Sequence, residues 1–285
     1  MTVNSLNTSS VYGPVDSWRL GKSLGVDLIM DTSTCSFNCT YCQLGFIQKT
    51  TSQRNLFVST EKVIADFKKS NWMDSDIITF SGSGEPTLAL NLGEVICKIK
   101  EIIKNNLPFK SIPIGILTNG TLLNDPDVRN DVLKVDIISV KLDAINDTVL
   151  NLINRPIPGI NLNSILEGIE KLKEDINHVE SCHGMTLHSK ILQIQVMFMP
   201  QNKDKISDFA ILLNKIKPDE VALNTPTRPY PSGWDIITRG AHGEDAKKIK
   251  YPVKPLKILT KDEAFQIESK LKELTGLKVI SVYKP

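Results

Sequence analysis

The amino-acid sequence predicts an α/β fold built on a largely parallel sheet. Apolar or β-branched runs alternate along the chain with segments of helical periodicity, which is typical of consecutive βαβ units. The chain has 285 residues, of which 41% are hydrophobic and 23% charged, enough for the core of one barrel-sized enzyme domain. Six strand–helix pairs emerge from the pattern, fewer than the eight of a complete (β/α)8 barrel.

The expected strands are short apolar runs. They are predicted at 26–30, 76–81, 114–118, 136–142, 191–199 and 220–224. Because alternate side chains of a strand share a face, one face of the fourth strand should carry Ser139, Lys141 and Asp143. Glutamines on so apolar a fifth strand indicate that its face toward the barrel lumen carries Gln193, Gln195 and Met197.

The expected helices lie between and after these strands. They are predicted near 60–69, 92–104, 126–133, 162–173, 204–216 and 261–274. Ser59 or Thr60 can cap the first helix, and Glu61 then stands in the first turn, where the helix dipole favours a negative charge.

The composition restricts the class of protein and its compartment. The net charge of +2 is too small to indicate a nucleic-acid partner by itself. No apolar run approaches the roughly 20 residues of a membrane span, so no membrane association is expected. Five cysteines are an odd number, and the chain begins without a charged and then apolar leader, so we expect a reducing, cytoplasmic compartment rather than a disulfide framework.

Three closely spaced cysteines are the most informative motif of the chain. Cys35, Cys39 and Cys42 form a C-x3-C-x2-C pattern directly after the first expected strand. A [4Fe–4S] cluster normally takes four cysteine ligands, so three thiolates on one loop would leave one iron open for another ligand. Zinc is the weaker alternative, because it usually needs four Cys or His ligands and no His lies near this motif.

Polar residues follow the other expected strands on the face where α/β proteins bind ligands. The second strand is followed by Ser81, Gly82, Gly84 and Glu85, and glycines there let a ligand approach the backbone. The third strand is followed by Thr118 and Asn119, and the sixth ends at Asn224. Ordinary turn and capping chemistry explains such residues equally well.

Lys141 and Asp143 are expected inside the barrel at the end of the fourth strand. A structural ion pair is one explanation of this placement. The other is a functional lysine that binds an anionic substrate or forms a Schiff base, which makes this pair the candidate catalytic residues.

The cysteine spacing, with Tyr41 before the last cysteine, resembles the signature of the radical S-adenosylmethionine (radical SAM) superfamily. The Gly84-Glu85-Pro86 turn is similar to a second element of that superfamily, although Ser83 replaces its first glycine. Further stretches resemble the small radical SAM proteins related to the enzymes of wyosine formation in tRNA; these are Tyr12-Gly13-Pro14-Val15, Arg19 to Asp27, Cys42-Gln43-Leu44-Gly45 and Asn224 to Pro229.

This resemblance implies a partial (β/α)6 barrel of the TIM type, with a [4Fe–4S] cluster and S-adenosylmethionine (SAM) as cofactors. It implies that the cluster is bound by Cys35, Cys39 and Cys42. Electron transfer from the cluster would cleave SAM to a 5′-deoxyadenosyl radical, which abstracts hydrogen from a substrate. The expected contacts to SAM come from Tyr41, Ser81, Gly82, Gly84, Glu85, Thr118, Asn119, Asp143, Gln195 and Asn224.

The resemblance also suggests an organisation and partners. We expect a lead-in segment at 1–25, the radical SAM core at 26–228, and a C-terminal loop or lid with a terminal helix and strand at 229–285. A flavodoxin or ferredoxin would donate the electron. The substrate is expected to be tRNA or, alternatively, a protein, a peptide or a small molecule. A non-catalytic iron–sulfur carrier or sensor remains as a rival class, which would leave the Gly84-Glu85-Pro86 turn unexplained.

Overall fold

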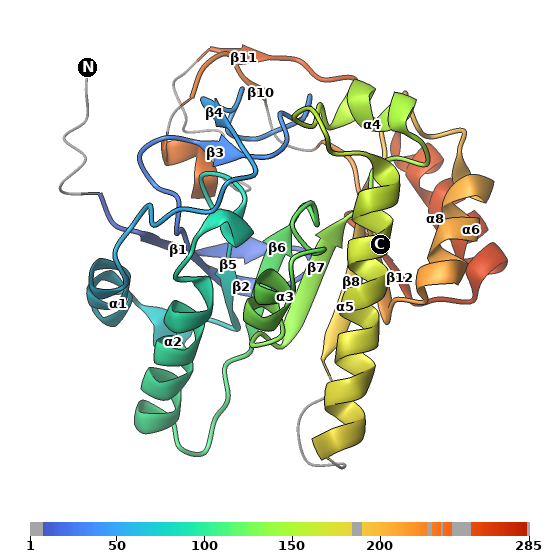
Figure 1. Cartoon of the computed structure of the whole chain (residues 1–285). Helices are drawn as coiled ribbons and strands as arrows, with labels where there is room; N and C mark the ends of the chain where they lie inside the picture. Colours follow the sequence, from blue (N-terminus) through green and yellow to red (C-terminus); the bar gives the residue numbers. More distant parts are fainter. Residues whose placement is uncertain (1–7, 184–189, 227–229, 235, 241–251, 284–285) are drawn as a thin grey trace.

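A computed structural model shows the chain as an open, curled sheet flanked by helices (Figure 1). It describes residues 8–183, 190–226, 230–234, 236–240 and 252–283. The sheet has eight strands in the order β1-β2-β5-β6-β7-β8-β9-β12. Their bounds are Val11–Ser17, Gly21–Val26, Ile77–Phe80, Ile114–Thr118, Ile137–Lys141, Ile191–Met197, Glu220–Asn224 and Val279–Ser281.

The sheet is parallel from β2 to β12, so all these strands end on the same side. Consecutive strands pair in register, as Ser23 with Ile77 and Lys141 with Gln195 illustrate. Only β1 runs antiparallel, against β2 at one edge, and β12 adds a parallel strand beyond β9 at the other. The six parallel strands from β2 to β9 form the expected partial (β/α)6 barrel, which the two added edge strands leave open.

The first expected strand, 26–30, is misplaced. β2 ends at Val26, and the chain then turns because Asp27 Oδ1 accepts the backbone N–H groups of Ile29 and Met30. Met30 takes a positive φ of 60°, which a strand does not allow. The apolar run after Val26 is therefore a buried turn that leads into the cysteine loop.

Helices cover the outside of the sheet and are mostly where the periodicity predicts them (Figure 1). Their bounds are α1 Thr60–Lys69, α2 Leu92–Asn106, α3 Pro126–Val132, α4 Asp147–Ile153, α5 Leu162–His183, α6 Ile206–Ile216 and α8 Lys261–Thr275. Ser59 is the N-cap of α1 and accepts the Lys62 N–H, as expected. The short helix α4 is not predicted, and α5 extends ten residues beyond its expected end at 173.

The two faces of the sheet differ in chemistry. The outer face carries apolar side chains that pack under the helices, among them Leu24, Ile78, Ile116, Val140 and Ile194. The inner face is largely polar, and it includes Ser23, Thr79, Lys141 and Gln195. As expected, Ser139 and Gln193 lie on the same face of neighbouring strands, where Ser139 donates a hydrogen bond to Gln193.

Short elements gather above the carboxyl ends of the parallel strands (Figure 1). They include the strand pairs β3 (Thr34–Cys35) with β4 (Lys49–Thr50) and β10 (Tyr230–Pro231) with β11 (Val253–Lys254). Much of the expected lid, namely 229, 235 and 241–251, lies outside the described residues. No helix in the described ranges is long and apolar enough to cross a membrane.

Candidate functional site

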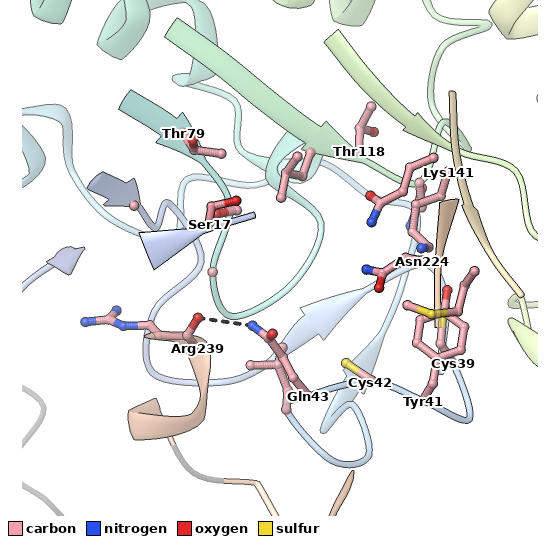
Figure 2. A pocket seen from close by; sticks show the side chains of 18 of the residues that line it. Ser17, Cys39, Tyr41, Cys42, Gln43, Thr79, Thr118, Lys141, Asn224 and Arg239 are labelled. Atoms are coloured by element: carbon pink, nitrogen blue, oxygen red, sulfur yellow. Dashed lines mark hydrogen bonds between the residues drawn. The ribbon is translucent and has the colours of Figure 1, made fainter. Parts of the chain in front are cut away.

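A cavity of about 550 Å³ lies inside the open barrel and below the short elements (Figure 2). Its walls combine strand ends, the cysteine loop and part of the C-terminal segment. The cavity brings together every expected site residue except Asp143, namely Cys35, Cys39, Tyr41, Cys42, Ser81, Gly82, Gly84, Glu85, Thr118, Asn119, Lys141, Gln195 and Asn224. Its volume falls in the range of ordinary cofactor and ligand pockets, roughly 300–1,000 Å³.

The cysteine loop is held by backbone hydrogen bonds at both ends. At the start of the loop, in β3, the Thr34 N–H donates to the Ser83 carbonyl. After the loop, the Thr51 N–H donates to the Cys35 carbonyl. Within the loop, Cys42 N–H donates to the Cys39 carbonyl, which makes a tight turn that brings these two cysteines together. The three cysteines therefore face one cavity from one short loop, as their spacing predicts.

Burial and crowding make the free thiols hard to ionise. Burial raises the pKa of all three, that of Cys42 to about 12, and the Cys39 thiolate further raises the pKa of both Cys35 and Cys42. A positively charged iron centre would reverse this effect and hold the thiolates ionised. The described residues contain no group of three His, Cys, Asp or Glu side chains that converge on a single metal ion. A cubane cluster needs no such convergence, because each cysteine binds a different iron, so the three cysteines fit it.

Two glycines allow the turn after β5 to approach neighbouring segments closely. A Cβ on Gly84 would lie 1.7 Å from the Thr34 carbonyl oxygen, in the strand that leads to Cys35. A Cβ on Gly82 would lie 2.4 Å from Asp27 Cγ, and Gly82 has a φ of 149° that other residues rarely adopt. Gly84 therefore lets the turn after β5 pack against the cysteine loop, and Gly82 lets the same turn pack against the end of β2.

Glu85 is buried, and its carboxylate is bound by protein donors. Oε1 accepts from Thr87 N–H, Thr87 Oγ1 and Thr118 Oγ1, and Oε2 accepts from Asn119 N–H. Burial raises the pKa of Glu85 in spite of these hydrogen bonds. The carboxylate thus ties the turn after β5 to the end of β6, and it also borders the cavity.

Asn119 turns its side chain toward the cysteine loop. Its Nδ2 lies 3.4 Å from Cys35 Sγ and 2.8 Å from Ser36 Oγ. Its Oδ1 accepts from Thr121 N–H and Thr121 Oγ1. Thr118 and Asn119, which follow the third expected strand, therefore connect Glu85 and Cys35 rather than merely ending a strand.

Lys141 and Asp143 form an ion pair next to Tyr41. Lys141 Nζ lies 3.5 Å from Asp143 Oδ1 and 4.9 Å from the centre of the Tyr41 ring. Asp143 is buried behind that ring, where it accepts from Tyr41 Oη, Asn154 Nδ2 and the Met197 N–H. Lys141 faces the cavity, as Figure 2 shows, whereas Asp143 positions its neighbours from outside the cavity wall.

The remaining expected residues line the cavity from three strands. Gln195 and Asn224 lie on β8 and β9, and Figure 2 places Asn224 between Lys141 and the cysteines. Ser81 follows β5 and is hydrogen bonded to Tyr12 Oη on the antiparallel strand β1. The sequence predicts only a lead-in segment at 1–25, whereas in the structure β1 forms part of the cavity wall.

Asn154 and Arg239 are parts of the site that sequence reasoning did not assign. Asn154 follows α4 and donates to Asp143, with Cys39 Sγ 3.5 Å away. Arg239 is buried, and its Nη1 lies 3.0 Å from Asp27 Oδ2. Its backbone oxygen accepts from Gln43, next to Cys42 (Figure 2). The Pro- and Gly-rich C-terminal segment signalled a loop over the site, but no local pattern singled out these two residues.

Replacing Arg239 with methionine is expected to lower the free energy of unfolding by about 3 kcal/mol, because it leaves the Asp27 carboxylate buried without its cation. Urea unfolding measures this change. The control is Lys270→Met, which removes an exposed pair with Glu273 and should cost less than about 1 kcal/mol. Equal small changes in both variants would contradict a structural role for the buried pair.

Comparisons with known proteins find related sequences over most of this chain. The model of the radical SAM superfamily matches residues 29–191. A UPF0026 protein of Synechocystis sp. is 43% identical over 240 residues, which cover 83% of each chain. A protein named GTPase Obg, of Brachyspira hyodysenteriae, is 36% identical over 249 residues, which cover 87% of this chain but only 34% of that protein.

Solved structures share the fold at low sequence identity. The structure of native anSMEcpe with bound AdoMet has a TM-score of 0.56 at 17% identity, covering 88% of this chain and 62% of that chain. SuiB of Streptococcus suis bound to the precursor peptide SuiA has a TM-score of 0.55 at 12% identity, covering 88% and 47%. Archaeal TYW1 has a TM-score of 0.50 at 18% identity, covering 90% and 74%. The chain therefore belongs to the radical SAM superfamily, whose members are enzymes that use a [4Fe–4S] cluster and SAM, and to the UPF0026 group of proteins.

Proposed function

We propose that this enzyme binds its cluster through Cys35, Cys39 and Cys42 and uses it to modify a substrate held in the same cavity. The observation that carries the proposal is that these cysteines share one cavity with Lys141, Glu85 and the polar strand ends. When bound, the cluster and SAM supply an electron and a 5′-deoxyadenosyl radical that abstracts hydrogen from an unactivated carbon.

The residues around the cavity have distinct proposed roles toward SAM. The Lys141 ammonium faces the cavity beside the cysteine loop, so it can bind the carboxylate of the methionyl group. Glu85 keeps the turn at 82–86 in place, and Oε2, which accepts only one hydrogen bond among the described residues, can accept from the SAM ammonium. Backbone at Gly82 and Gly84 borders the cavity without side chains in the way. Tyr41, Gln195 and Asn224 are the proposed walls for adenosine.

Enclosure by the C-terminal segment is part of the proposed function. The Arg239 backbone borders the cavity and holds Gln43, so residues 236–240 cover one side of the space next to Cys42. A site closed to water protects a reactive radical from side reactions. The protein thus contributes placement and exclusion, and the cofactors contribute the bond-breaking chemistry.

For the substrate we propose RNA, with tRNA as the first candidate. Exposed cations stand on segments beside the cysteine loop, namely Arg155, Lys254 and Lys257. Burial raises the pKa of Tyr230 and the charge of Arg155 partly offsets this rise, and Tyr230 pairs with Lys254, so Arg155 and Lys254 lie near the same strand pair. Clustered cations favour a polyanion. A peptide is the second candidate, because the likeness of fold extends to SuiB, which has been solved with a precursor peptide.

The test is anaerobic reconstitution with iron and sulfide, reduction with dithionite and measurement of 5′-deoxyadenosine by mass spectrometry. Product is expected only in iron-loaded protein. Added tRNA should increase the yield, and the increase should fall steeply with salt, because phosphate contacts release counterions. Deoxyadenosine from iron-free protein would overturn the proposal. Stimulation by peptides but not by RNA would replace the RNA substrate while leaving the chemistry in place.

A further inference from the structure

Two of the three cysteines face the side-chain amide of an asparagine. Asn119 Nδ2 lies 3.4 Å from Cys35 Sγ, and Asn154 Nδ2 lies 3.5 Å from Cys39 Sγ. These distances are suitable for N–H···S hydrogen bonds. The asparagines come from different parts of the barrel, after β6 and after α4, so the two contacts arise independently.

Each amide is fixed with its nitrogen toward the sulfur. For Asn119, Oδ1 accepts the backbone N–H of Thr121 at 3.0 Å, so the NH2 group has to face the cysteine loop. For Asn154, Nδ2 lies 2.7 Å from the Asp143 carboxylate, which only a donor can approach so closely. Rotating either amide would bring two donors or two acceptors together.

Asn154 also destabilises the folded state, because its side-chain oxygen is buried without a hydrogen-bond partner among the described residues. The residue is 1% exposed, and its Oδ1 has no hydrogen-bond partner within the described part of the chain. A buried acceptor without a partner typically costs about 1–3 kcal/mol. Its NH2 group, in contrast, serves Asp143 and Cys39 at once. A buried oxygen without a partner in the described ranges, such as Asn154 Oδ1, calls for a functional explanation in a native structure.

We propose that Asn119 and Asn154 are positioning residues that raise the reduction potential of the cluster. The inference rests on the proposed binding of the cluster by Cys35 and Cys39. Reduction adds negative charge to a cluster and its sulfurs, and an N–H donor aimed at a ligand sulfur stabilises that charge. The two amides therefore favour the reduced state, from which SAM is cleaved. Cys35 and Cys42 also receive backbone N–H groups, from Phe37 and Leu44, which no side-chain substitution removes.

The inference is tested by the midpoint potential of the reconstituted cluster, measured by EPR during a redox titration without SAM. Asn119→Leu and Asn154→Leu each remove one donor at similar side-chain volume. Each should make the equilibrium constant for reduction about tenfold smaller, which is 59 mV for a one-electron couple. The matched control is Asn124→Leu, whose amide donates to the Ser164 carbonyl and contacts no cysteine. Its potential should equal that of the wild type.

Iron and sulfide contents separate this inference from the proposed function. A wild type that assembles no cluster would overturn both. A wild type that cleaves SAM, with full clusters and unchanged potentials in both leucine variants, would overturn this inference alone. If a leucine variant loses its cluster, wild type labelled with 15N at the asparagine side-chain amides decides the question. Pulsed EPR of its reduced cluster should detect coupled 15N nuclei, and their absence would overturn the inference.

Discussion

Cys39→Ala is expected to abolish formation of 5′-deoxyadenosine and to prevent the cluster from assembling intact. Cys39 is the middle cysteine of the loop and a proposed ligand, with Asn154 and Lys141 next to it. Alanine leaves an iron without its thiolate, and water cannot replace the charge of that ligand in a buried site. Iron and sulfide per chain and deoxyadenosine after reduction with dithionite measure the effect.

The chain provides a matched control for this substitution. Cys97 lies exposed on α2, so Cys97→Ala removes a thiol without touching the cavity. This variant should keep the iron content and the product yield of the wild type. Product from Cys39→Ala at the wild-type rate would mean that the loop does not hold the catalytic cluster. A stable cluster that yields no deoxyadenosine in the wild type would instead favour an electron carrier or sensor.

Gly84→Ala is expected to remove cluster binding without changing any proposed ligand. The added Cβ would lie 1.7 Å from the Thr34 carbonyl oxygen, and that atom belongs to backbone rather than to a flexible side chain. Two hydrogen bonds of 3.0 Å, Thr34 N–H to the Ser83 carbonyl and Glu85 N–H to the Thr34 carbonyl, hold the segments together at this point. The strand that carries Cys35 therefore has to move, at a cost of about 3 kcal/mol, the upper end of the range typical of overpacking.

The measurements for Gly84→Ala are cluster content and deoxyadenosine yield, which should fall more than about tenfold if two such hydrogen bonds are lost. Gly233→Ala is the control, because a Cβ there meets no atom within 4 Å. It should behave as the wild type does. Full cluster content in Gly84→Ala would show that the contact between the glycine turn and the cysteine strand is dispensable.

The sequence predicts the parallel sheet well because each strand is a continuous apolar run between turn residues. It fails at 26–30, where the run is equally apolar but Asp27 closes a turn with its own side chain. Residues Leu28 to Met30 are buried as a strand would be, so hydrophobicity alone cannot distinguish the two structures. Helix α4 has only seven residues, too few for a clear period, and it lacks the proline that marks the start of the equally short α3.

The site is predictable where chemistry is concentrated in a short motif. Cys35, Cys39 and Cys42 have a characteristic spacing, and Lys141 follows from strand parity. Asn154 and Arg239 lack both signals, because their partners lie 115 and 212 residues away in the sequence. Asparagine and arginine are common in loops for other reasons. Only the folded chain shows which of them face a thiol or a buried carboxylate.

The pairing of Asp27 with Arg239 sets an order for the maturation of the protein. The cysteine loop is synthesised early, whereas the residue that neutralises Asp27 and holds Gln43 comes 212 positions after Asp27. A ribosome-bound chain shorter than 239 residues has the three cysteines but not the segment that closes the space next to them. The space next to Cys42 is therefore closed only after residues 236–240 have packed against Asp27, long after the cysteine loop has been made.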